Sequence, residues 1–181
     1  MTLGPRSPLS HAWRRANQLT LTAISRHPLS VLLIISAPRR RSQHALRLLP
    51  GDDLSDALEA YVKSRQLGAA CIITCVGSLS LATIRLAGAR EIVTLEEELE
   101  VVSLVGTLCQ GAPGATRHLH IALSRTDGTV MGGHIKGPCT VATTAEVIIG
   151  AMPELRFARA FEAATGYLEL HIGQQELNHA S

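Results

Sequence analysis

The chain has 181 residues, of which 46% are hydrophobic, 18% charged and 3% aromatic. This composition supports one folded domain with an aliphatic core and excludes a wholly disordered chain. No apolar run approaches the roughly 18–20 residues of a membrane span, which excludes a polytopic membrane protein. The four cysteines form no CxxC pair and indicate free thiols rather than a disulfide scaffold. Because the first 51 residues contain eight Arg and no acid, a +8 segment precedes a −6 body.

Residues 1–44 form a basic extension whose apolar residues recur at three- and four-residue spacing, as on one helix face. These residues are Leu9, Ala12, Trp13, Ala16, Leu19, Ala23 and Ile24. An Arg-rich, acid-free, amphipathic segment is typical of a mitochondrial transit peptide, which predicts a mitochondrial location. The alternative is an extension without an import address on a cytoplasmic or nuclear protein. In that case Arg39–Arg41 is a candidate nuclear signal or DNA-backbone contact.

One segment of the body has the pattern of a strong helix. Asp52 or Asp53 can cap its N-terminus, and acidic residues fill its first turns. Its apolar positions include Leu54, Leu58, Tyr61 and Val62. Lys63 and Arg65 lie near its end, and Gly68 fits a C-terminal cap.

The rest of the body has the pattern of strands, either alternating or continuously apolar. The predicted strands are residues 46–48, 70–76, 78–86, 98–108, 118–124, 129–136, 140–149 and 167–172. One helix against many strands joined by short links predicts an α+β fold with a largely antiparallel sheet. We therefore expect one compact domain over residues 45–175, followed by a tail at 176–181.

A histidine pair begins the most informative stretch of the sequence. His118 and His120 lie two residues apart in a predicted strand, so both imidazoles project from the same face. Leu119 and Ile121 then point to the opposite face. For this spacing alone, two histidines on the polar face of a half-exposed hairpin are the simpler explanation.

The turn that follows decides whether a third histidine joins the pair. A three-residue loop, Thr126–Gly128, with Gly128 in the left-handed conformation, places His134 opposite His120. A two-residue loop would instead place His134 opposite Ile121, on the wrong face. The first register puts all three histidines on one face, with opposing Cβ atoms roughly 5 Å apart.

Three neutral imidazoles on one face can hold a zinc ion or another divalent transition metal. They leave one coordination position open, as in catalytic rather than structural zinc sites. Gly132 and Gly133, just before His134, leave space for a ligand or a neighbouring chain. The alternative, that the three histidines are solvated polar residues, stays open at this point.

Glu146 is the candidate for proton transfer, because it lies in the apolar strand Thr143–Ile149. A carboxylate in such a strand is expected to be paired, near a site or at an interface. It would act as a general base or as the partner of a metal-bound histidine. The competing interpretation is an edge or interface glutamate.

Several segments, in order, resemble the plants-and-prokaryotes conserved (PPC) domain family over residues 45–173. They are Leu46–Asp53, Ala70–Ser78, Glu100–Thr107, His118–His134 and Thr143–Gly150. The resemblance implies a compact α/β domain that assembles as a homotrimer. For the prokaryote-like branch it implies a metal, usually zinc, held by three histidines, which correspond here to His118, His120 and His134.

The resemblance implies no particular activity. If the protein is an enzyme, the open metal position favours Lewis-acid chemistry, such as hydrolysis, on a small molecule. The plant branch joins the domain to an AT-hook, but Pro38–Arg41 lacks the central glycine of that motif. The alternatives are a DNA-associated module that contacts nucleic acid only through the Arg-rich leader, and a trimeric scaffold without metal.

Overall fold

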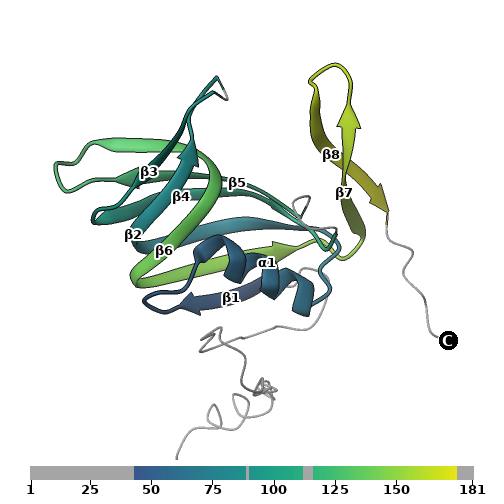
Figure 1. The fold of residues 1–181 in the computed structure, drawn as a ribbon. Helices are drawn as coiled ribbons and strands as arrows, with labels where there is room; N and C mark the ends of the chain where they lie inside the picture. The colour runs from purple at the N-terminus through teal and green to yellow at the C-terminus, as the bar shows by residue number, and fades with distance from the viewer. Residues whose placement is uncertain (1–42, 89, 112–115, 175–181) are drawn as a thin grey trace, which may run out of the picture.

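The computed structural model describes residues 43–88, 90–111 and 116–174 (Figure 1). The predicted leader lies almost wholly outside these residues, as does the tail at 176–181, and both stay predictions. The strands and the helix are β1 (Gln43–Leu48), α1 (Leu54–Ser64), β2 (Ala70–Arg85), β3 (Ile92–Leu95), β4 (Leu99–Leu108), β5 (Arg117–Ser124), β6 (Val130–Ala151), β7 (Leu155–Glu162) and β8 (Tyr167–Gln174). The helix α1, the one described helix, is too short to cross a membrane.

Four antiparallel strands close into a small barrel. β6 pairs with β5, β5 with β4 and β4 with β2, and β2 returns to pair with β6. β1 extends the sheet beside β6, and the short β3 extends it beside β2. The long strands β2 and β6 bend around the barrel, with several register shifts along their shared ladder. A closed sheet pairs the edges that an open sheet would leave exposed.

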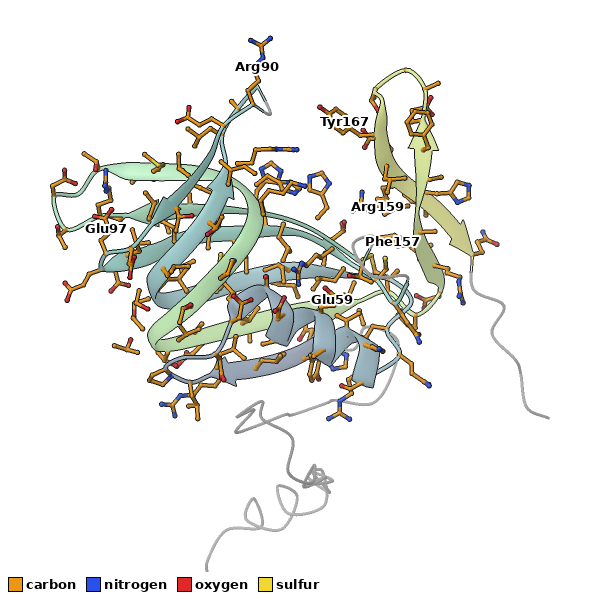
Figure 2. The ribbon with its side chains drawn as sticks, in the orientation of Figure 1. Glu59, Arg90, Glu97, Phe157, Arg159 and Tyr167 are labelled. Carbon is orange, nitrogen blue, oxygen red and sulfur yellow. The ribbon has the colours of Figure 1, made fainter. Side chains whose placement is uncertain are left out.

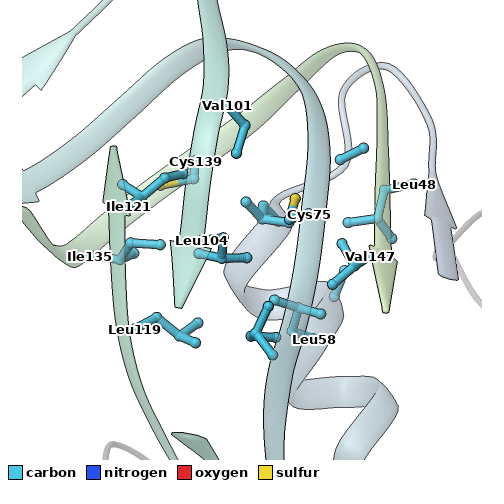
Figure 3. Close-up of a cluster of buried hydrophobic side chains, with 14 of the residues drawn as sticks. Leu48, Leu58, Cys75, Val101, Leu104, Leu119, Ile121, Ile135, Cys139 and Val147 are labelled. Atoms are coloured by element: carbon cyan, nitrogen blue, oxygen red, sulfur yellow. The ribbon is translucent and has the colours of Figure 1, made fainter. Parts of the chain in front are cut away.

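The core fills the barrel and the space beneath α1 (Figure 3). Alternate residues of the strands point inward, among them Leu104 of β4, Leu119 of β5 and Val147 of β6. Leu58 of α1 is fully buried in the same cluster. Because burying a Leu or Val side chain contributes about 1.5–3 kcal/mol, this aliphatic core is the main source of stability.

Asp53 fixes the helix to the barrel. Its Oδ1 accepts a hydrogen bond of 2.9 Å from the amide of Asp56 and caps α1. Its Oδ2 accepts one of 2.7 Å from the amide of Cys139 in β6. One carboxylate therefore holds both the start of the helix and the strand beneath it.

A hairpin of β7 and β8 stands beside the barrel (Figure 1). In the described part of the chain these two strands pair only with each other. At its base Phe157 packs with Ala69 and Cys109 in a second small cluster. Its outer part exposes large apolar side chains, including Phe161 and Leu168.

The antiparallel strands, the single helix and the Asp53 cap are confirmed. Other details of the prediction were wrong. Residues 70–76 and 78–86 belong to one bent strand, as do 129–136 and 140–149, and β3 and β7 were missed. The helix ends before Gly68, because Gln66 already adopts a left-handed conformation with φ of 53°. The chain is richer in strand than a balanced α+β fold, and closure of the sheet into a barrel was not anticipated.

Candidate metal centre

Two of the three predicted histidines lie side by side on β5. Leu119 and Ile121 are buried in the barrel, so His118 and His120 point outward from the same face. Behind them, Gly106 of β4 has a φ of +145°, and a Cβ there would collide with the backbone of His118. A glycine at this position therefore lets β4 approach β5 closely beneath the histidines.

The β5–β6 turn brings the third histidine to the pair. The amide of Arg125 donates a hydrogen bond of 2.9 Å to the carbonyl oxygen of Thr129, and Gly128 has a φ of +79°. This is the predicted three-residue loop, and it places His120 directly opposite His134. The register expected from the sequence is therefore confirmed.

The nitrogen atoms of the three imidazoles have the spacing of a metal site. His118 Nε2 and His120 Nε2 lie 3.1 Å apart, and His134 Nδ1 lies 3.3 Å from His120 Nε2. One ring nitrogen can be chosen from each histidine so that all three atoms lie within 4.8 Å of one another. For a tetrahedral zinc ion with bonds of 2.0–2.1 Å, neighbouring ligand atoms are about 3.3 Å apart. The donor set and its spacing therefore fit such an ion.

The environment of the cluster favours neutral imidazoles, the form that binds metals. Burial lowers the pKa of His134 to about 4, and the nearby charge of Lys136 acts in the same direction. Burial also lowers the pKa of His118, with a further contribution from Arg159 of the hairpin. Both side chains can therefore offer a nitrogen lone pair at neutral pH.

An open pocket of about 710 Å³ adjoins the cluster. His120 and His134 line it, together with Arg85 at the end of β2 and Tyr167 of the hairpin. Figure 2 shows Tyr167 and Arg159 on the β7–β8 hairpin, beside the barrel. This volume is within the range of pockets that bind small molecules.

The structure does not bring Glu146 to this site within one chain. It lies twelve residues beyond His134 on β6, exposed and in register with Arg47 of β1. It does not line the pocket beside His120 and His134. The geometry of one chain therefore offers no support for a role in proton transfer.

Sequence reasoning missed three residues beside the histidines: Arg85, Arg159 and Tyr167. Arg85 is opposite His134 in the β2–β6 ladder, a pairing between segments far apart in the chain. Arg159 lies on the strand that the prediction omitted. The alternation of Leu155–Glu162 was a signal for that strand, but nothing in the sequence indicated that it lies near His118.

The fold and the histidine cluster together define a small β-barrel domain with a candidate metal centre on its surface. The model of the Plants and Prokaryotes Conserved (PCC) domain matches residues 35–153. The chain belongs to this family, which confirms the resemblance drawn from the sequence.

Relatives of known name share only part of their length with this chain. A bifunctional protein GlmU of Synechococcus sp. (strain JA-3-3Ab) is 44% identical over 129 residues, which are 71% of this chain and 20% of that protein. AT-hook motif nuclear-localized protein 20 of Arabidopsis thaliana is 28% identical over 125 residues, 68% of this chain and 44% of the relative. The chain thus spans about a fifth of the first relative and under half of the second.

Two solved structures have the same fold over nearly their whole length. A hypothetical protein from Salmonella has 41% identity and a TM-score of 0.71, with 77% of this chain and 99% of that chain covered. A metal-containing protein from Archaeoglobus fulgidus has 27% identity and a TM-score of 0.62, with 77% and 98% covered.

Proposed function

We propose that this protein is a metal-binding homotrimer in which His118, His120 and His134 hold a divalent transition metal, with zinc the first candidate. The spacing of the imidazole nitrogen atoms carries the proposal, because 3.1 and 3.3 Å are close to the edge of a tetrahedral zinc site. Support also comes from the related Archaeoglobus protein, which is described as containing metal.

The three imidazoles would supply three ligands to such a metal, and a four-coordinate ion would keep one position for a bound molecule or water. A metal with one open position acts as a Lewis acid on a bound small molecule or on water. His120 and His134 line the pocket, so a small molecule that enters it meets the metal-binding face. Hydrolysis, or a related Lewis-acid step, is the class of chemistry that we assign to such a site.

Metal content per chain tests this proposal. We expect close to one equivalent of metal in protein purified without chelators, and little in a His120→Ala/His134→Ala variant. His171→Ala is the matched control, because His171 is an exposed histidine of the β7–β8 hairpin. A parent protein that takes up no metal after incubation with zinc would overturn the proposal.

Exposed apolar side chains support association with further copies of the chain. They lie on the outside of the barrel and on the hairpin, and include Ile73, Val76, Val102, Val105, Phe161, Leu168 and Ile172. So many exposed large apolar residues are typical of a protein interface. Sedimentation should give three times the mass of one chain, and a monomer at micromolar concentration would exclude the homotrimer.

A second candidate function, DNA association through the Arg-rich leader, is favoured by the AT-hook relatives. It predicts DNA binding that falls steeply with salt and disappears when residues 1–44 are deleted. Binding that survives the deletion would contradict it. Cleavage of the chain near residues 40–45 in mitochondria would instead support the transit peptide and remove the basic segment from the mature protein.

A further inference from the structure

Three cationic side chains from three different elements surround the histidine cluster. Arg85 of β2 is directly opposite His134, so both side chains lie on the outer face of the barrel. Lys136 follows His134 by two residues on β6 and projects from the same face. Each of these cations acts electrostatically on His134.

The third cation comes from the hairpin. Arg159 of β7 donates a hydrogen bond of 2.7 Å from Nη2 to Thr107 Oγ1. Thr107 is directly opposite His118 in the β4–β5 ladder. This contact fixes the guanidinium beside the first histidine, on which its charge also acts.

These charges are not balanced by the described residues around the cluster. The one carboxylate that acts on His118 is Glu169 of β8, and the groups acting on His134 include Lys136 and Arg85 but no acid. A divalent metal would add two further positive charges. Like charges that lie close together repel one another, so an anion beside the metal-loaded histidines would stabilise them.

The pocket provides a place for that anion. Arg85, His120 and His134 line it, and so does Ser103. Gly133 also lines it, and a Cβ there would lie 2.5 Å from the Arg85 carbonyl oxygen. The planar guanidinium of arginine matches two oxygens of a carboxylate or a phosphate.

We infer that the pocket binds a small molecule through an oxyanion group, a carboxylate or a phosphate, which completes the metal site and is held by Arg85 with Lys136 and Arg159 nearby. This inference rests on the proposed metal function and names the class of its ligand. Because the metal and the anion carry opposite charges and would bind side by side, each favours binding of the other, and their affinities are reciprocally coupled.

Cobalt provides the test, because the visible absorption of a Co²⁺ ion responds to its ligands. The full chain is loaded with Co²⁺ in a buffer free of oxyanions and titrated separately with inorganic phosphate, acetate and neutral acetamide. We expect a saturable spectral change with phosphate or acetate but not with acetamide, and the responding anion identifies the group. Arg85→Gln should weaken anion binding roughly tenfold or more.

Arg47→Gln is the matched control, because Arg47 lies on β1 and does not line the pocket. Lys136→Gln is a second variant with the same expected direction, should Arg85→Gln fail to fold. The anion should also tighten Co²⁺ binding by the factor by which Co²⁺ tightens anion binding.

The outcomes separate the two proposals. If Co²⁺ binds but neither anion changes its spectrum or affinity, the inference is overturned and the metal site stands. The same holds if acetamide acts as well as acetate, or if Arg47→Gln weakens anion binding as much as Arg85→Gln. If no Co²⁺ binds, the metal function is overturned and the inference fails with it.

Discussion

Replacing Gly133 with alanine should disturb the proposed metal site without changing any of the three histidines. An added Cβ would lie 2.5 Å from the carbonyl oxygen of Arg85 and 3.1 Å from its carbonyl carbon. These are backbone atoms of β2, so no side-chain rotation relieves the clash. Relative to an ordinary Cβ contact of about 3.4 Å or more, the two strands must separate locally by roughly 0.5–1 Å.

The displacement is large on the scale of a metal site. His134 follows Gly133 on β6 and moves with it, whereas His118 and His120 lie on β5. Metal–ligand distances tolerate only about 0.2 Å, so we expect metal affinity to fall roughly 10–100-fold. Crowding of this kind also costs about 1–3 kcal/mol of stability.

Competition with a chelator gives the metal affinity, and urea unfolding gives the stability. Gly173→Ala is the matched control, because a Cβ there would lie an ordinary 3.7 Å from the Arg156 carbonyl oxygen on the hairpin. The reasoning is refuted if Gly133→Ala binds metal as tightly as the parent protein and Gly173→Ala.

Three further predictions concern the body of the fold. Asp53→Ala should lower the free energy of unfolding, measured in urea, by about 2–4 kcal/mol, because the helix loses its cap and the amide of Cys139 loses its partner. An unchanged free energy of unfolding would contradict this account. Burial lowers the pKa of His44 below 6.5, so the unfolded chain binds more protons. The free energy of unfolding of the metal-free protein should be highest above about pH 6.5 and should fall as the pH drops below that value. The fall should be shallower in His44→Gln, and equal slopes in the two proteins would count against His44 as its cause. Burial raises the pKa of Cys75 and Cys139 to about 11, so at pH 8 iodoacetamide should label them more than about 100-fold faster in urea than in the native protein; similar rates would refute that burial.

The sequence was most informative where the relevant contacts are local. Helix α1 follows from a capping aspartate and apolar spacing within a dozen residues, and both were predicted. The register of His120 against His134 follows from one turn, in which Gly128 takes the positive φ that a three-residue loop requires. A single hairpin therefore contains all the information that brings the three histidines together.

Features that depend on distant pairing could not be predicted in the same way. The alternation of apolar and polar residues shows which side chains share a face of a strand, but not which other strands pair with it. Nothing therefore indicated that β2 pairs with both β4 and β6. Residues 129–136 and 140–149 were predicted as two strands, whereas β6 runs through both with shifts in its pairing to β2. β7 is different, because its partner β8 is the next strand in the chain and its alternation was a local signal that the prediction overlooked.

This difference between local and distant contacts also divides the candidate site. The three histidines belong to one hairpin, whereas Arg85 reaches them through the β2–β6 ladder and Arg159 through the separate β7–β8 hairpin. Substitutions in β2 or β7 can therefore alter the charge around the pocket without moving a histidine. It follows that a chain of this fold can keep its three histidines while changing the charge around the pocket, because the two features depend on different segments of the sequence.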